Sequence, residues 1–171
     1  GVLQALFEYN SIAYTSCDVL RSASCMDKAC SKRLFESMLL NVLPYEVVSK
    51  TEFDREKSKT IAKLEDIIRY PMIVKPASQG SSIGIEVAKC REELDFALQV
   101  ASKFDEKIVV EHKLEDFVEV NCAAYSKNGR IVISDTEQPC SASDFLTFED
   151  KYTGGKMSAS AHRIPAEIGS V

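Results

Sequence analysis

The chain has no tryptophan, only two histidines among its 171 residues, and no apolar run near the roughly 20 residues that a membrane helix needs. Its amino terminus has neither the basic start nor the apolar stretch of a secretory signal. We therefore expect no membrane partner and a cytoplasmic location. Lysine and arginine number 21 against 26 aspartates and glutamates, a formal net charge of -5. This lack of excess positive charge disfavours a nucleic-acid partner.

No two cysteines have CxxC spacing, and only His112 and His162 could complete a zinc site, so structural zinc is disfavoured. The neighbours of each cysteine are apolar or small, which favours buried free thiols in a reducing compartment. The six cysteines concerned are Cys17, Cys25, Cys30, Cys90, Cys122 and Cys140.

The composition is that of an ordinary globular protein, with 45% hydrophobic and 27% charged residues, and it allows one domain or two small lobes. Apolar spacing predicts a helix over 2–9, and Ser24-x-x-Asp27 has capping-box spacing just before a second helical pattern that Pro44 ends. The apolar stripe of that pattern comprises Met26, Ala29, Cys30, Leu34, Phe35 and Met38. On the opposite side, Lys28 and Lys32 are one turn apart.

Further along, a loop with some helix is expected from 49 towards 68, and a helix with glutamates in its first turn follows Cys90. The apolar face of that helix comprises Leu94, Ala97, Leu98 and Ala101. Strands are predicted at 45–48, 71–74, 83–87, 107–111, 118–125 and 131–134, with 118–125 the clearest period-2 pattern and Asn128-Gly129 a hairpin turn before the last strand. This order predicts an α+β fold with antiparallel sheet.

The segment most indicative of chemistry is Lys75 at the end of a buried-type strand, followed by the Gly/Ser-rich loop 76–84. Glycines let a backbone approach a ligand closely, and exposed N–H groups with hydroxyls form an anion cradle beside a lysine that can bind phosphate. The loop is not a Walker loop, because GxxxxGK[ST] is absent. By itself, such a loop is more often a flexible hairpin with a surface lysine.

Four other short motifs occur in a fixed order around this loop, although each alone would be ordinary surface. They are Met26-Asp27-Lys28, Val109-Val110-Glu111, Glu119-Val120-Asn121 and Phe148-Glu149-Asp150-Lys151-Tyr152. In this order, together with Ile12-Ala13-Tyr14-Thr15 and Arg163-Ile164-Pro165-Ala166, the chain resembles D-alanine–D-alanine ligases and their D-lactate and D-Ser relatives over nearly its whole length.

The resemblance implies an ATP-grasp fold in which two small α+β lobes with antiparallel sheets hold a nucleotide. It implies a remnant or linker of an amino-terminal domain over 1–24, a central lobe over 25–113, and the start of a carboxy-terminal lobe with its flap over 114–171. The reaction implied is ATP-dependent joining of two D-alanines through an acylphosphate for peptidoglycan synthesis.

The same resemblance assigns the phosphate and substrate contacts. Lys28 and Lys75 would contact the ATP phosphates, with Lys75 also near the base. Ser81 and Ser82 lie in the loop that closes over the triphosphate. Ser81 would also position the first D-alanine together with Tyr152.

The adenine and ribose contacts follow in the same way. Glu111, with the backbone at His112 and Leu114, matches the segment that binds the adenine amino edge. Glu119 matches the acid that holds the ribose hydroxyls, and Lys151 would reach the phosphates from the flap.

The implied cofactors are ATP and Mg²⁺, the implied partners are ATP and D-alanine, and the full-length protein is expected to be a homodimer. No acidic cluster in the chain has the family's metal spacing, so we predict no metal ligands within it. The amino-terminal lobe and the metal-binding segment are expected to lie before Gly1 and after Val171. We expect the 171 residues alone to be inactive and to bind ATP weakly.

Three other interpretations stay open at this point. The protein could be another ATP-grasp ligase, such as one that joins D-alanine to D-serine or D-lactate. It could be a nucleotide-binding module without catalysis. It could also be an α+β domain whose Gly/Ser loop binds no nucleotide, and binding of ATP to the intact chain and to Lys75→Ala would separate this last case.

Overall fold

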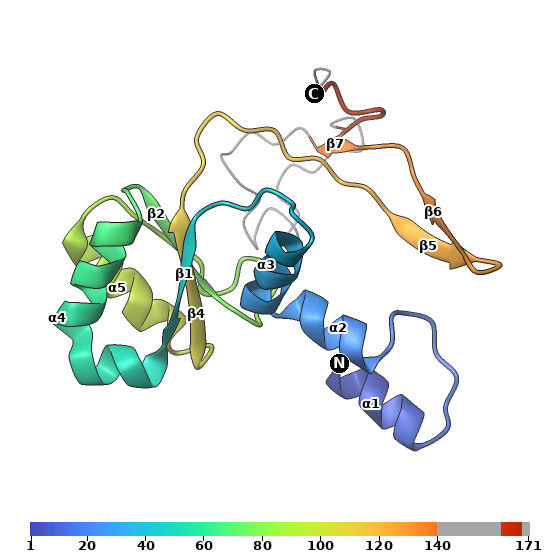
Figure 1. Cartoon of the computed structure of the whole chain (residues 1–171), viewed down its shortest axis with the longest axis horizontal. Helices are drawn as coiled ribbons and strands as arrows, with labels where there is room; N and C mark the ends of the chain where they lie inside the picture. Colours follow the sequence, from blue (N-terminus) through green and yellow to red (C-terminus); the bar gives the residue numbers. More distant parts are fainter. Residues whose placement is uncertain (140–161, 169–171) are drawn as a thin grey trace. The chain divides into compact units, whose positions relative to one another are not determined.

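The computed structural model describes residues 1–139 and 162–168, and the contacts within the chain divide it into two units, Gly1–Lys113 and Leu114–Val171. The first unit contains α1 (Val2–Tyr9), α2 (Val19–Met26), α3 (Lys28–Ser37), β1 (Tyr45–Ser49), α4 (Lys50–Ile67), β2 (Met72–Pro76), β3 (Glu86–Ala88), α5 (Arg91–Ala101) and β4 (Lys107–His112) (Figure 1). The second contains β5 (Ala124–Lys127), β6 (Arg130–Ile133), β7 (Gln138–Pro139) and β8 (His162–Arg163). The α+β class with antiparallel sheets is therefore confirmed.

The first unit is organised by a four-stranded sheet in the order β1-β4-β2-β3, with antiparallel pairing throughout. Because side chains alternate across a strand, β4 has two different faces. Ile108 and Val110 belong to the large core formed with α4 and α5, whereas Val109 packs with Ala29 of α3. The sheet thus separates α4 and α5 from α3 (Figure 1).

The core beneath α4 and α5 follows the helical period. All four residues of the apolar face predicted after Cys90 are fully buried in α5, with Glu92 and Glu93 in its first turn. The loop expected from residue 49 was wrong, because α4 begins at Lys50, where the Ser49 side chain accepts a hydrogen bond from the Glu52 N–H. This helix has few apolar residues, but three of them, Phe53, Ile61 and Leu64, are buried and pack it against the core.

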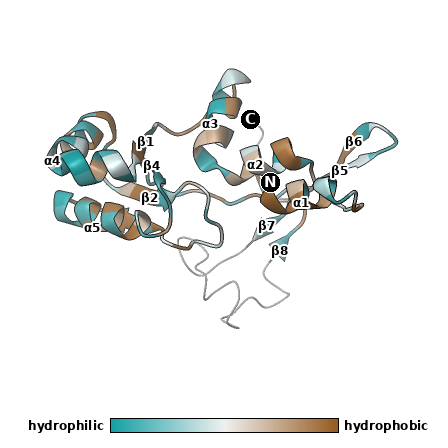
Figure 2. Cartoon of the chain, turned by 90° about the horizontal axis from the view of Figure 1, so that it is seen from below, coloured by the Kyte–Doolittle hydropathy of each residue, from teal (hydrophilic) through white to brown (hydrophobic). Residues whose placement is uncertain are grey.

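The helix predicted over 2–9 is confirmed as α1, but the capping and the burial predicted for the helices after it were wrong. Ser24 does not cap a helix but lies within α2, whose N-cap is Asp18, and Asp27 alone caps α3. The stripe predicted along α3 is mostly exposed, since only Ala29 is buried there. Side chains of α1 and α2 are likewise open to solvent, and Figure 2 shows the apolar character of α1. The spacing of apolar residues predicts helices in this region, but it does not predict which of their faces are buried.

In the second unit, the Asn128-Gly129 turn is confirmed. It joins β5 and β6, and its two residues have positive φ values of 52° and 74°, as a two-residue hairpin requires. The strand predicted over 118–125 was wrong for most of its length. The strand begins only at Ala124, and Asn121 forms a single bridge with Glu137. Val118 and Val120 are exposed, so the alternation is not supported by burial within the described residues.

The prediction of buried thiols was also wrong. Cys17, Cys25 and Cys122 are exposed, Cys30 and Cys90 are half-buried, and all five are free. Cys140 lies outside the described residues. None of the described helices combines the length and the apolar composition of a membrane-spanning segment.

Candidate functional site

Lys75 of β2 and Glu111 of β4 lie on the face of the sheet opposite α4 and α5. The antiparallel register pairs Ile73 with Glu111 and Lys75 with Val109, which makes Lys75 and Glu111 diagonal neighbours on one face. The Lys75 ammonium donates a hydrogen bond to Glu111 Oε1 and forms an ion pair with it. Strand alternation therefore delivers both predicted residues to one place.

A second lysine, Lys32 of α3, binds the other oxygen of the same carboxylate. Its Nζ lies 2.5 Å from Glu111 Oε2, and the Glu111 side chain is only 5% exposed. Burial would raise the pKa of Glu111, but the positive charges and hydrogen bonds of Lys75 and Lys32 outweigh it, so the pKa is lowered. Glu111 is thus an ionised carboxylate between two ammonium groups.

Lys28 begins α3 and reaches the root of the Gly/Ser loop. Its ammonium donates to the carbonyls of Pro76, Ala77 and Gln79 at 2.9, 3.3 and 2.5 Å, and its backbone N–H donates to the Ala77 carbonyl at 3.0 Å. Burial lowers the pKa of Lys28, and the nearby charge of Lys75 lowers it further. The lysine therefore sits against the loop, close to a second cation.

The loop itself adopts an uncommon backbone. Ser81, Ser82 and Gly84 have φ values of 51°, 62° and 69°, in the left-handed region that disfavours residues with a side chain. Two turn hydrogen bonds shape it, from the Ile83 N–H to the Gly80 carbonyl and from the Ile85 N–H to the Ser82 carbonyl. Strained non-glycine residues of this kind tend to occur where a loop binds a ligand.

The charge of this cluster suits an anion. Four lysines, Lys28, Lys32, Lys75 and Lys107, lie near three carboxylates, Glu111, Asp27 and Asp105, so the net charge of this group is one positive. Within residues 1–139 and 162–168, no group of three or more His, Cys, Asp or Glu side chains could hold a metal ion. The cluster can therefore attract a polyanion, while the described residues do not form a metal centre.

The remaining predicted residues are distributed as follows. His112 is half-buried and its Nδ1 lies 3.1 Å from the Arg69 carbonyl oxygen. Leu114 and Glu119 belong to the second unit, where both are exposed. Lys151 and Tyr152 lie outside the described residues.

The structure therefore brings Lys28, Lys75 and Glu111 together, and it adds Lys32, which the sequence prediction left without a role. One signal could have identified Lys32. It follows Lys28 by four residues, and positions i and i+4 of a helix share a face.

The profile of a known family, described as "D-ala D-ala ligase C-terminus", matches residues 34–170, which contain the Gly/Ser loop, Lys75 and Glu111. The chain belongs to the D-alanine–D-alanine ligase family. Relatives align with almost the whole length of this chain. It is 38% identical to a D-alanine–D-alanine ligase of Caldicellulosiruptor bescii over 172 aligned positions, which cover 98% of this chain and 46% of that protein. It is 33% identical to that of Thermosipho africanus, with coverage of 98% and 44%.

Solved structures of the ligase family have the same fold. The VanG D-Ala:D-Ser ligase of Enterococcus faecalis matches with a TM-score of 0.77 at 27% identity, over 99% of this chain and 47% of that one. The D-alanine–D-alanine ligase of Helicobacter pylori matches with a TM-score of 0.67 at 26% identity, over 80% and 40%. The ATP-grasp fold expected from the sequence is confirmed. The chain spans less than half the length of these relatives.

Proposed function

We propose that this chain is the nucleotide-holding part of an ATP-dependent ligase that joins two D-alanines. The observation that carries the proposal is the convergence of Lys28, Lys32, Lys75 and Glu111 on one face of the sheet, beside the Gly/Ser loop. We assign the central lobe to 25–113, the start of the carboxy-terminal lobe to 114–171, and a linker to 1–24.

The phosphates of ATP are held by the lysine cluster and the loop. Lys28 and Lys75 supply charge, and Ser81 and Ser82 supply hydroxyls and backbone N–H groups from a loop already bent into the left-handed region. Three carbonyls at the root of the loop already accept from the Lys28 ammonium. The ammonium therefore exchanges at least one carbonyl for a phosphate oxygen when the nucleotide binds.

The adenine lies against the end of β4 in this proposal. Glu111 and the backbone at His112 and Leu114 bind its amino edge, and Glu119 holds the ribose hydroxyls. Because Lys75 and Lys32 keep Glu111 ionised, its carboxylate is a hydrogen-bond acceptor at the working pH.

The chemistry is the activation of a carboxylate. A carboxylate oxygen of the first D-alanine attacks the γ-phosphorus of ATP, ADP leaves, and the amine of the second D-alanine displaces phosphate from the acylphosphate to form the amide bond. Lysines lower the barrier by positioning the phosphates and neutralising their charge. Lys151 adds a further cation, and Ser81 with Tyr152 positions the first D-alanine.

Magnesium accompanies ATP in this reaction class, where it supplies charge to the phosphates. The described residues offer no group of acidic or histidine ligands for it, so no step is assigned to a metal held by them. We place its ligands, like most of the D-alanine pocket, outside this chain.

The product is a dipeptide for peptidoglycan precursors, so we propose a role in cell-wall synthesis and cell shape, in the cytoplasm, with the whole protein acting as a homodimer. We propose no membrane or nucleic-acid partner. The structural match to the D-Ala:D-Ser ligase of E. faecalis favours D-serine as the second candidate acceptor. A product assay of the whole protein with D-alanine alone and with added D-serine distinguishes the two acceptors.

Nucleotide binding is tested by titrating the chain with ATP and following its unfolding temperature, since a ligand that binds only the folded state raises it. We expect a rise with ATP, and a much smaller one for Lys75→Ala and Lys28→Met. Lys63→Met is the matched control, because Lys63 pairs with Glu46 between α4 and β1 and touches neither the loop nor Glu111. An intact chain that shows no response to ATP contradicts the proposal.

A further inference from the structure

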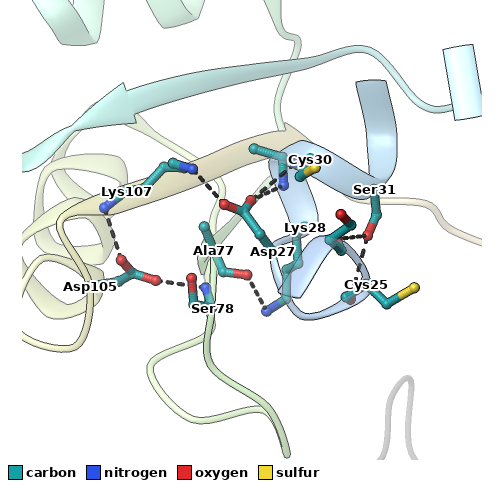
Figure 3. Close-up of polar contacts among 11 residues, drawn as sticks. Cys25, Asp27, Lys28, Cys30, Ser31, Ala77, Ser78, Asp105 and Lys107 are labelled. Atoms are coloured by element: carbon teal, nitrogen blue, oxygen red, sulfur yellow. Dashed lines mark hydrogen bonds and ion pairs between the residues drawn. The ribbon is translucent and has the colours of Figure 1, made fainter. Parts of the chain in front are cut away.

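Asp27 and Lys107 form an ion pair between the start of α3 and the start of β4, 80 positions apart in sequence. The Lys107 Nζ lies 2.5 Å from Asp27 Oδ2 (Figure 3). Asp27 Oδ1 accepts from the N–H groups of Ala29 and Cys30. One carboxylate therefore caps α3 and ties it to the sheet. Burial raises the pKa of Asp27, but Lys107 and the two N–H groups outweigh it, so the pKa is lowered.

The ion pair belongs to a chain of contacts that ends at the Gly/Ser loop. Asp105 accepts from the Ser78 N–H at 2.6 Å and from the Lys107 N–H at 3.1 Å (Figure 3). The Ala77 N–H donates to the Lys107 carbonyl at 2.9 Å, and the Ala77 carbonyl accepts from the Lys28 N–H. The end of β2, the start of β4 and the first turn of α3 are thereby held together.

The place of this ion pair matters more than its strength. The Lys107 and Asp27 side chains are 46% and 20% exposed, and solvent screens a pair this open, so the pair contributes little to the stability of the fold. Asp27, however, immediately precedes Lys28, and Lys107 is two residues from Asp105, which holds the loop. A small displacement at the pair would move the Lys28 ammonium and the root of the loop relative to each other.

We propose that Asp27 and Lys107 are positioning residues for the triphosphate. Their ion pair fixes the first turn of α3 so that Lys28 contacts the loop in the arrangement that binds phosphate. Because the site is ordered before the nucleotide binds, less conformational entropy is lost on binding. The inference rests on the proposed function, since it concerns the same nucleotide site. It predicts that loss of the ion pair lowers the affinity for ligands that carry the phosphates and leaves the affinity for the base and ribose unchanged.

The first test measures the affinities of the intact chain and its variants for ATP and for adenosine, which lacks the phosphates. Lys107→Met removes only the ammonium and keeps the side-chain stem and both backbone contacts. We expect ATP to bind about fivefold or more weakly, with adenosine unchanged. Lys107→Arg restores the charge and with it most of the ATP affinity.

Asp27→Asn separates the ion pair from the helix cap, because asparagine is as good an N-cap as aspartate. Asp27→Asn should reduce the affinity for ATP by about as much as Lys107→Met does. The double variant should bind ATP no more weakly than either single variant, since both substitutions remove the same interaction. Lys63→Met serves as the control, because it also breaks a pair between a helix and a strand and leaves a similarly exposed side chain. It should bind ATP like the unmodified chain.

The second test needs no ligand. Amide hydrogen exchange at Lys28, Ala77 and Ser78 should be faster in Lys107→Met than in the unmodified chain, whereas amides of α5 should exchange at the same rate in both. Equal exchange at the three amides overturns the inference, as does a loss of affinity that is the same for ATP and adenosine. If the unmodified chain binds no ATP, the proposed function fails by itself, and the exchange result then decides whether the pair holds the loop.

Discussion

Glu111 and Lys75 are 36 residues apart in sequence, and the register of β2 and β4 makes them diagonal partners on the face of the sheet away from its large core. Lys32 engages the second carboxylate oxygen, so a side chain that is only 5% exposed has a cation on each oxygen. An isolated carboxylate could not remain charged at such a position, because burial disfavours the charged form. The positive charges and hydrogen bonds of Lys75 and Lys32 stabilise the ionised form of Glu111 at this buried position.

The lowered pKa of Glu111 predicts how stability depends on pH. Because the pKa in the folded chain lies below its ordinary value of 4.5, the stabilisation is fully present above that value and is lost as the pH falls through the folded-state pKa. Glu111→Gln should be less stable by about 3 kcal/mol near neutral pH and should show a flatter dependence in acid. Urea unfolding across the acid range measures both, and parallel curves for the two proteins would contradict the prediction.

Removing Lys32 should raise the pKa of Glu111, which its two lysines lower in the unmodified chain. Without one of its two cations the carboxylate loses attraction for its charged form, so its pKa should rise in Lys32→Met. A carboxyl-carbon NMR titration reports this directly. Lys63→Met, on the other side of the sheet, should leave the Glu111 titration where it is in the unmodified chain.

Two glycines of the Gly/Ser loop should respond differently to alanine. Gly84 has a φ of +69°, and a Cβ there would lie 2.6 Å from Phe104 Cδ2 and 2.9 Å from Pro76 Cγ. Gly84→Ala should therefore cost about 1 to 3 kcal/mol, as left-handed backbone and crowding combine. A Cβ on Gly80 meets nothing within 4 Å, and Gly80→Ala should change stability by less than about 0.5 kcal/mol. Similar losses in both variants would show that the loop is ordered differently.

Two leucines test which predicted apolar faces form a core. Leu64 of α4 is fully buried, so Leu64→Ala should cost about 2 to 5 kcal/mol through lost burial and the cavity it leaves. Leu34 of α3 is 47% exposed, and Leu34→Ala should cost less than about 1 kcal/mol. Denaturant midpoints of the two variants give the comparison, and a larger loss at Leu34 would restore the stripe predicted from sequence.

Local patterns succeeded where one element decides the outcome. The face of α5, the strands β1, β2 and β4, and the Asn128-Gly129 turn follow from period and turn chemistry alone. The same rules failed where burial depends on a partner element. The alternation at 118–125 and the stripe on α3 are present in the sequence, but the described residues do not bury them.

The candidate site divides in the same way. The sequence alone determined the Lys75 strand, the Gly/Ser loop that follows it and the family order of the motifs, because these are properties of neighbouring residues. Only the tertiary structure decided that Lys32 would complete the pair on Glu111 and that Asp27 would bind Lys107. Those contacts depend on how α3 lies on the sheet, with the small side chain of Ala29 packed against Ala77 and Val109. Spacing along the chain sets which residues share a face, while packing sets which charges meet across it.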